Sequence, residues 1–168
     1  MFYLELFRAL EEEKVRYLLV GGVAVNLHGA ERLTMDVDLM LALDAENLRR
    51  FLAVAKRLTL KPVLPVTLEQ FCDAKTVGSW VRDKRMLAFQ LRSPDARAPS
   101  VDILVKPVVP FEPAYGRRAT MRVEEVPIDV AAAEDLIALK SGTGRLIDRS
   151  DIQALHRLDE LKRRRRDD

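Results

Sequence analysis

The chain has 168 residues, of which 48% are hydrophobic and 32% are charged, and its formal net charge is +2 at pH 7. This composition is too apolar for a disordered protein, and the length suffices for one domain that folds without stabilising disulfide bonds or metal ions. A single cysteine, Cys72, excludes an internal disulfide, and no apolar run approaches the roughly 20 residues that span a bilayer. We predict one domain over residues 1–168 in the cytoplasm, without membrane association.

The first part of the chain alternates between helical and strand patterns. Apolar residues recur at helical spacing near the N-terminus, and a short apolar run then ends at a glycine pair. The predicted elements are a helix over 2–13, a strand over 17–20, one or two helical turns over 23–28, a strand over 33–43, and a helix over 44–58 with Asp44 as its N-cap.

The second part predicts more strands and then helices. The elements are a short helix that begins at a Thr67/Gln70 capping box, a loop or weak strand over 75–83, strands over 86–91 and 101–105 that resemble a hairpin, a last strand over 122–130 interrupted by Pro127, and helices over 132–140 and 150–162. The basic tail, residues 162–168, is interpreted either as a solvated helix end or as a segment that attracts nucleic acid or an acidic partner. The fold class is α/β (α+β), with a mixed, mostly antiparallel sheet flanked by helices.

Two aspartates separated by one residue carry the strongest chemical signal. Because side chains alternate along a strand, Asp36 and Asp38 project from the same face. Asp102 lies in another predicted strand and supplies a third carboxylate. Magnesium prefers such hard oxygen ligands, with phosphates and water in its remaining positions, and two ions can clamp both oxygens of a phosphoryl displacement. The pattern predicts a metal site at Asp36, Asp38 and Asp102.

A glycine pair precedes these aspartates. Gly21 and Gly22 let the backbone approach a phosphate, and the helix after them offers unpaired N–H groups. The pair is not a Walker A loop, because no Gly-Lys-Ser/Thr follows, and it is not the dinucleotide fingerprint, because the third glycine is missing.

Together these residues resemble the nucleotidyltransferases of the DNA polymerase beta superfamily. Gly21, Gly22, Asp36, Asp38 and Asp102 match its signature, and the intervening AVNLHGAERLT is most similar to small bacterial AbiEii/MenT-type proteins. The resemblance implies a polymerase-beta-like nucleotidyltransferase fold and two Mg²⁺ ions, with Asp102 orienting or deprotonating the nucleophile. It also implies NMP transfer from an NTP to a hydroxyl on tRNA, protein or a small molecule, and a toxin with a cognate antitoxin is one role that fits it.

The segment EDLIALKSGTGRLIDRSDIQAL is similar to the same group. There the resemblance implies that Lys140 takes part in catalysis and, with Arg145 and Asp151, lies near the nucleotide. Purely structural roles stay open as alternatives: Lys140 could complement a helix dipole, Asp148 could be the N-cap of the last helix, and Asp151 could be an acidic residue in its first turn.

One departure from the family pattern concerns the glycine pair, Gly21 and Gly22, which we call the glycine turn. Many relatives have serine where this chain has Gly22, so backbone N–H groups must replace a hydroxyl contact to the terminal phosphate. Arg32 and Thr34 are predicted to shape the approach to the aspartates or to reach a phosphate. An alternative function is a catalytically weak module that binds NTP and regulates or contacts another protein.

Overall fold

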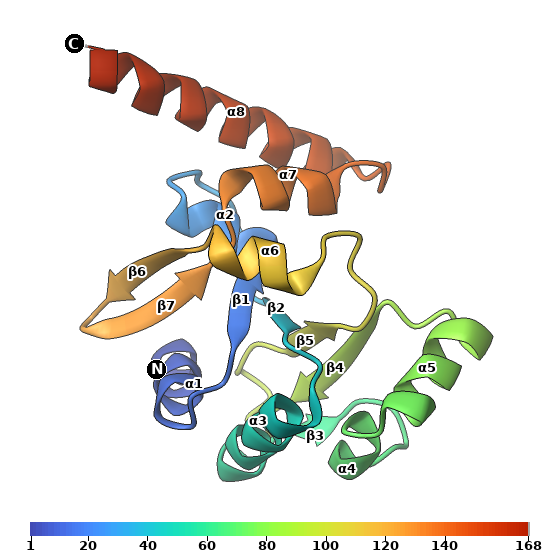
Figure 1. The fold of residues 1–168 in the computed structure, drawn as a ribbon. Helices are drawn as coiled ribbons and strands as arrows, with labels where there is room; N and C mark the ends of the chain where they lie inside the picture. The colour runs from blue at the N-terminus through green and yellow to red at the C-terminus, as the bar shows by residue number, and fades with distance from the viewer. Residues whose placement is uncertain (168) are drawn as a thin grey trace.

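The computed structural model describes residues 1–167 and is built around a seven-stranded sheet in the order β3-β4-β5-β2-β1-β7-β6 (Figure 1). The strands are β1 (Tyr17–Val20), β2 (Val37–Leu41), β3 (Lys61–Pro62), β4 (Ala88–Arg92), β5 (Val101–Leu104), β6 (Ala119–Val123) and β7 (Val126–Val130). Strand β2 runs parallel to β5 and β1 parallel to β7, whereas the other four pairs are antiparallel. The predicted mixed, mostly antiparallel sheet is confirmed.

Helices lie around this sheet. They are α1 (Phe2–Glu12), α2 (Gly21–Leu27), α3 (Ala45–Arg57), α4 (Leu68–Phe71), α5 (Ala74–Asp83), α6 (Phe111–Gly116), α7 (Ala133–Lys140) and α8 (Leu146–Asp167). Figure 1 shows α8 running along α7, with its C-terminal end projecting past the body, while α3, α4 and α5 gather at the opposite end. Within residues 1–167, no helix is long and apolar enough to cross a membrane.

The core forms where the central strands meet the helices. Strand β1 is buried along its whole length, and Phe7 of α1 and Phe51 of α3 are almost fully buried. Trp80 of α5 stacks on Phe89 of β4 with ring centroids 5.6 Å apart. Burying one such side chain contributes about 1.5–3 kcal/mol relative to leaving it exposed, so these contacts fix the helices on the sheet.

The segment predicted as a loop or weak strand over 75–83 is in fact helix α5. Asp73 is its N-cap, and its carboxylate accepts hydrogen bonds from the backbone N–H groups of Lys75 and Thr76. The apolar residues Val77 and Trp80 lie three apart and so share a helix face. The prediction was wrong because it gave no weight to this cap.

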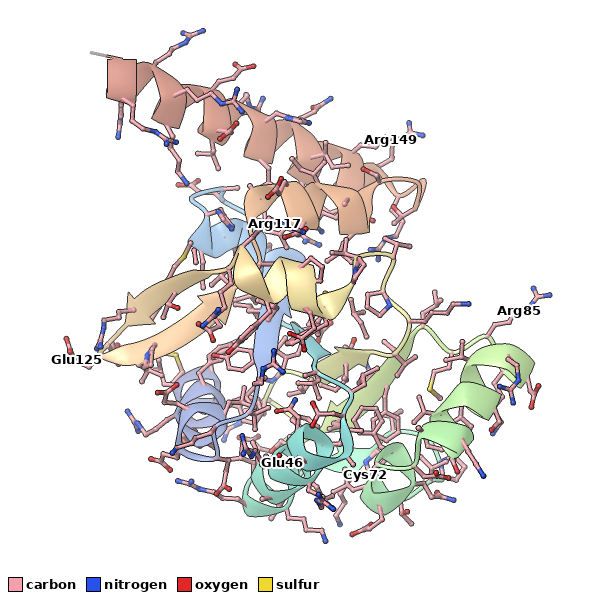
Figure 2. All side chains as sticks on the ribbon, in the orientation of Figure 1. Glu46, Cys72, Arg85, Arg117, Glu125 and Arg149 are labelled. Carbon is pink, nitrogen blue, oxygen red and sulfur yellow. The ribbon has the colours of Figure 1, made fainter. Side chains whose placement is uncertain are left out.

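The predicted strand over 122–130 is two strands. Strands β6 and β7 form a hairpin, with Glu124 and Glu125 at its tip, both at positive φ (46° and 66°). Figure 2 shows Glu125 at the outer end of this hairpin. Turns of this kind usually contain glycine or asparagine, so a Glu-Glu pair gave no turn signal.

The last helix begins earlier than predicted. Instead of starting near residue 150, α8 begins at Leu146 and continues through the basic tail to Asp167. Asp148 therefore lies in its first turn, and the N-cap interpretation of Asp148 is wrong. Arg149, labelled in Figure 2, points away from the body of the molecule.

Other boundaries differ by a few residues. The second strand begins only at Val37, and α2 already starts at Gly21, so the glycine pair forms the first turn of that helix. The hairpin predicted from 86–91 and 101–105 is confirmed as β4 and β5. Short elements β3 and α6 were not predicted.

Candidate active site

Asp36, Asp38 and Asp102 lie on one face of the sheet; we call these three side chains the carboxylate row. Asp38 of β2 pairs with Asp102 of β5 in parallel register. Asp36 precedes β2, beside Ser100, whose carbonyl accepts a 2.9 Å hydrogen bond from the Val37 N–H. Their strand neighbours alternate into the core on the opposite face: Val37, Leu39, Val101 and Ile103 are fully buried. Residues 64 apart in sequence thus become neighbours.

Ser100 links two members of the carboxylate row. Its Oγ donates to Asp36 Oδ1 at 2.8 Å and lies 3.4 Å from Asp102 Oδ1. The side-chain amide of Gln90, on β4, donates to the same Oγ at 3.3 Å. Neither residue was predicted as part of the site from the sequence. The spacing of Ser100 two residues before Asp102 is a signal that could have found it, because it places both side chains on one face.

The charges of the row oppose one another. Burial, together with the negative charges of Asp102 and Asp36, raises the pKa of Asp38 to about 6, although Lys140 and Arg32 act to lower it. Burial also raises the pKa of Asp102, and the charge of Asp36 adds to that increase against hydrogen bonds from Gln90 and Ser100. The ionised row is therefore electrostatically unfavourable without a cation.

The donor atoms of the row fit a hard divalent cation. Carboxylate oxygens are what Mg²⁺ prefers, and it commonly takes only one or two of them from a protein. Within residues 1–167, no three His, Cys, Asp or Glu side chains converge in a way that could hold a metal ion. A cation here would thus depend on substrate oxygens and water for its remaining positions.

The glycine turn touches the carboxylate row. Gly21 has φ +67°, and a Cβ placed on it would lie 1.9 Å from Asp38 Oδ2. A Cβ on Gly22 would lie 2.6 Å from Arg32 Nη1 and 2.7 Å from Thr34 Oγ1. Each glycine therefore leaves space that a polar side chain fills. Asp38, Arg32 and Thr34 thus meet at the backbone of the turn.

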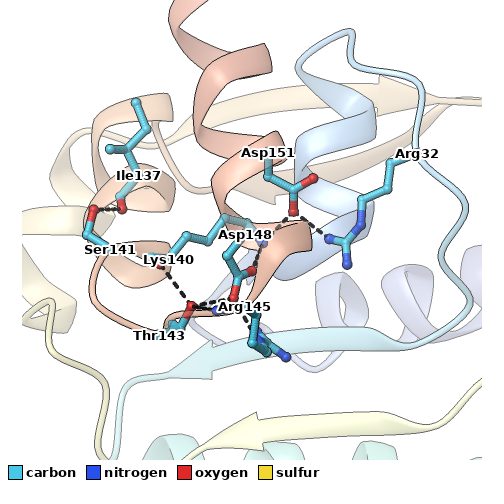
Figure 3. Close-up of polar contacts among 8 residues, drawn as sticks. All are labelled: Arg32, Ile137, Lys140, Ser141, Thr143, Arg145, Asp148 and Asp151. Atoms are coloured by element: carbon cyan, nitrogen blue, oxygen red, sulfur yellow. Dashed lines mark hydrogen bonds and ion pairs between the residues drawn. The ribbon is translucent and has the colours of Figure 1, made fainter.

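Arg32, Lys140, Arg145, Asp148 and Asp151 form a second group, the α7–α8 cluster (Figure 3). Asp151 Oδ2 lies 2.8 Å from both Lys140 Nζ and Arg32 Nη1. Asp148 contacts Lys140 Nζ at 3.1 Å and Arg145 Nε at 2.6 Å. This network ties the last two helices to the segment that precedes β2.

Burial separates the predicted nucleotide-binding residues into two kinds. Lys140 is only 7% exposed and Asp151 only 3%, so both are committed to each other and to their neighbours. The Arg145 side chain is 70% exposed, and Arg32 carries a buried Nε that, among the described residues, has no hydrogen-bond partner. Arg145 and Arg32 are thus the better placed cations for an external anion.

Comparison with known proteins identifies a fold class, because the chain shares the fold of solved nucleotidyltransferases. It is similar to the lincosamide antibiotic adenylyltransferase LnuA bound to lincomycin, at 18% identity and a TM-score of 0.56, covering 89% of this chain and 90% of that one. It is also similar to ANT(2")-Ia in complex with adenylyl-2"-tobramycin (13% identity, TM-score 0.55, 97% and 94% coverage).

A third similar structure is an antigenic nucleotidyltransferase-like protein from Paracoccidioides brasiliensis (18% identity, TM-score 0.55, 93% of this chain and 72% of that one). No protein-family model and no curated protein sequence matches the chain. At these identities the likeness establishes the fold. The predicted nucleotidyltransferase fold is thereby confirmed, and the likeness to AbiEii/MenT-type proteins stays a prediction.

Proposed function

We propose that this protein is a Mg²⁺-dependent nucleotidyltransferase that moves NMP from an NTP to a hydroxyl acceptor. The observation that carries the proposal is the contact between the glycine turn and the carboxylate row, in which Gly21 has no room for a Cβ beside Asp38. A turn that admits phosphates and acidic groups that suit cations are thus adjacent. That combination serves phosphoryl chemistry, in which catalysis is mainly positioning and charge stabilisation.

The carboxylate row would hold Mg²⁺, two ions in our proposal. When bound, Mg²⁺ supplies acidity to the acceptor hydroxyl and neutralises the negative charge of the departing pyrophosphate. Asp36 and Asp38 are the principal ligands, and Asp102 orients the acceptor hydroxyl or takes its proton. The positive charge of Lys140 favours the ionised form of Asp38, since it acts against the raised pKa of that carboxyl. This is the catalytic role that we assign to Lys140.

The triphosphate would lie on the glycine turn. Backbone N–H groups of Gly21 and Gly22 donate to its oxygens, as N–H groups at helix starts commonly do. Thr34 Oγ1 occupies the place beside Gly22 where a serine side chain would lie, so its hydroxyl replaces that contact. Arg32 and Arg145 balance the negative charge, while Asp151 and Lys140 hold Arg32 in position.

The proposal does not specify the chemical class of the acceptor. Lincomycin and an adenylylated tobramycin occupy similar structures, so small hydroxyl-bearing molecules are acceptors of this fold. A tRNA or protein acceptor, and a toxin role with an antitoxin partner, stay predictions from the sequence resemblance. The second candidate function, NTP binding without transfer, is favoured by the ion pairs that occupy Lys140.

Labelling of an acceptor tests the function. The protein is incubated with each α-labelled NTP, Mg²⁺ and a cell extract, and we expect label to enter an acceptor. The double variant Asp36→Asn plus Asp38→Asn should transfer none while keeping its fold. Transfer that survives both substitutions would exclude the assigned site. A melting shift with NTP and Mg²⁺ but no transfer by the wild-type protein would favour the binding module; a ligand at a hundred times its Kd adds about 2.7 kcal/mol.

A further inference from the structure

An open groove of about 560 Å³ lies between helix α8 and the segment 29–33 that follows α2; we call it the α8 groove. The segment runs along the helix, because a Cβ on Gly29 would lie 3.6 Å from Leu158 of α8. Further along, Arg32 Nη1 lies 2.8 Å from Asp151 Oδ2 (Figure 3). One wall of the groove is therefore α8, and the other is the segment that carries Arg32 towards the glycine turn.

The α8 groove exposes large apolar side chains. Leu33 is 98% exposed, and Ile147 and Leu161 of α8 are 44% and 53% exposed. A single apolar residue on a surface is ordinary, but several around one groove mark an interaction site. Covering them with a partner would remove apolar surface from water, which favours association.

The spacing of residues on α8 indicates the shape that fits the groove. Positions along this wall are alternately four and three residues apart: Ile147, Asp151, Ala154, Leu158 and Leu161. A second helix packs against a first one at this spacing. From the first of these residues to the last, the helix advances about 21 Å, since each residue adds about 1.5 Å. The groove thus fits a partner helix of about 14 residues.

The charge around the groove indicates the sign of the partner. The basic tail begins directly after Leu161, and residues 162–166 are all exposed. A second copy of this chain would be repelled: parallel α8 helices would bring two basic tails together, and antiparallel ones would bring each tail beside the exposed Arg145. Single-stranded nucleic acid usually stacks its bases on aromatic rings, and none of the described residues that line the groove is aromatic. An acidic helix suits both the leucines and the tail.

We propose that the α8 groove docks an acidic amphipathic helix of a partner protein. Apolar side chains of that helix pack on Leu33, Leu158 and Leu161, and its carboxylates face the basic tail. The docked helix lies against Arg32, at the edge of the proposed triphosphate site, whereas none of the carboxylate row lines the groove. Docking does not depend on nucleotidyl transfer, so it can be tested by binding alone.

A synthetic peptide provides the test. It has about 14 residues, with leucine at the alternating spacing of the α8 wall, glutamate and alanine elsewhere, and a side-chain cross-link on its outer face that keeps it helical. The labelled peptide is titrated with the full chain, and fluorescence anisotropy measures the Kd. A control peptide has lysine in place of each glutamate. The groove variants are Leu33→Ser and Leu161→Ser, and the matched control is Leu87→Ser, a leucine before β4 that is 75% exposed and lies outside the groove.

We expect the acidic peptide to bind the wild-type protein and Leu87→Ser equally, and the lysine peptide to bind neither. Each groove variant should raise the Kd about tenfold or more, because each loses one buried leucine contact, and should keep the wild-type melting temperature. Absence of binding by the acidic peptide, equal binding of the two peptides, or an unchanged Kd in both groove variants would overturn the proposal.

Two further measurements address the other occupants. A labelled RNA oligonucleotide that binds more tightly than the acidic peptide and displaces it would assign this surface to nucleic acid. Sedimentation equilibrium that shows a dimer of the wild-type protein, dissociated by Leu33→Ser, would assign the groove to a second copy of the chain. Either result would overturn the acidic partner helix.

Discussion

The carboxylate row and the α7–α8 cluster both hold acidic side chains, but they differ in burial and in how charge is balanced. Asp148 and Asp151 of the cluster are buried, whereas Asp38 and Asp102 of the row are partly buried and Asp36 is exposed. In the cluster, two carboxylates, Asp148 and Asp151, meet three cations. In the row, three carboxylates lie together, and none of them forms an ion pair with a described residue. Burial and mutual repulsion raise the pKa of Asp38 to about 6.

This difference indicates that the cluster stabilises the fold, whereas the row serves the function. Paired charges in the cluster satisfy one another and connect α7 and α8 to the segment before β2. Loss of one partner would therefore leave a buried charge uncompensated. The row gains nothing from its own charges, and such locally unfavourable arrangements concentrate at functional sites. A cation would relieve the repulsion in the row but would find no vacant ligand in the cluster. Four substitutions or conditions can break or sharpen this contrast.

The largest expected effect comes from Lys140→Met. It leaves Asp148 and Asp151 buried without their common cation, and breaking a buried ion pair in this way costs about 3–5 kcal/mol. Urea unfolding measures the loss in free energy of unfolding. Lys162→Met, at an exposed position of α8, is the matched control and should change it by less than about 0.5 kcal/mol. Equal effects of the two variants would show that the cluster is not a structural support.

Gly22→Ala should have the next largest effect. Its Cβ would meet Arg32 Nη1 and Thr34 Oγ1 at 2.6 and 2.7 Å, so it should cost about 1–3 kcal/mol of stability or displace the two side chains and weaken NTP binding. Calorimetric titration with NTP and thermal melting measure both effects. Gly116→Ala is the control, because a Cβ there meets nothing within 4 Å. Unchanged stability and NTP affinity in Gly22→Ala would remove the argument that Arg32 and Thr34 fill this space.

Acid should affect the two regions in opposite directions. The pKa of Asp38 in the folded protein, about 6, exceeds its ordinary value of about 3.9, so the folded state binds the extra proton and gains about 1 kcal/mol or more as pH falls from about 6 to 4. For Asp148, burial acts to raise the pKa, but hydrogen bonds from Thr143, Arg145 and Lys140 lower it overall. The contribution of ionised Asp148 to the free energy of unfolding is therefore complete above the ordinary pKa of aspartate and is lost as pH falls below about 4.

Urea unfolding of the metal-free protein across this pH range gives the measurement. Asp38→Asn should abolish the gain between about pH 6 and 4, and Asp148→Asn should reduce the loss below about pH 4. A wild-type profile that Asp38→Asn leaves unchanged would contradict the unbalanced charge of the row.

Arg145→Ala should have the smallest effect on stability. Its side chain is 70% exposed, and its buried partner Asp148 keeps its contacts with Lys140 and Thr143, so the loss of stability should be about 1 kcal/mol or less. NTP affinity should fall by a few-fold, since one cation near the triphosphate is lost. Arg149→Ala, an outward-facing arginine one turn further along α8, is the control and should leave both unchanged. Identical NTP affinity in the two variants would argue against a nucleotide contact by Arg145.

Local sequence signals were reliable where a single element produced them. The Asp44 cap of α3 and the Thr67/Gln70 capping box are present as predicted, since both depend on hydrogen bonds within four residues. Prediction failed where the signal was unusual or ignored, as at the Glu-Glu turn of β6 and β7 and the Asp73 cap of α5. The same contrast applies to the site: Asp36 and Asp38 follow from strand alternation, whereas Ser100 and Gln90 need the β4–β5–β2 pairing to become neighbours of Asp36.

The sequence alone determined which groups are available: a glycine pair, two aspartates at alternate strand positions, and a third aspartate in a later strand. Only the tertiary structure decided how they are used. Parallel pairing of β2 with β5 opposes Asp38 and Asp102, which makes a row of like charges from residues 64 apart. Packing of α8 on α7 buries Lys140 between two aspartates, so that this lysine of the predicted site also connects the two helices. Burial and pairing act across the chain, so no local pattern could specify them.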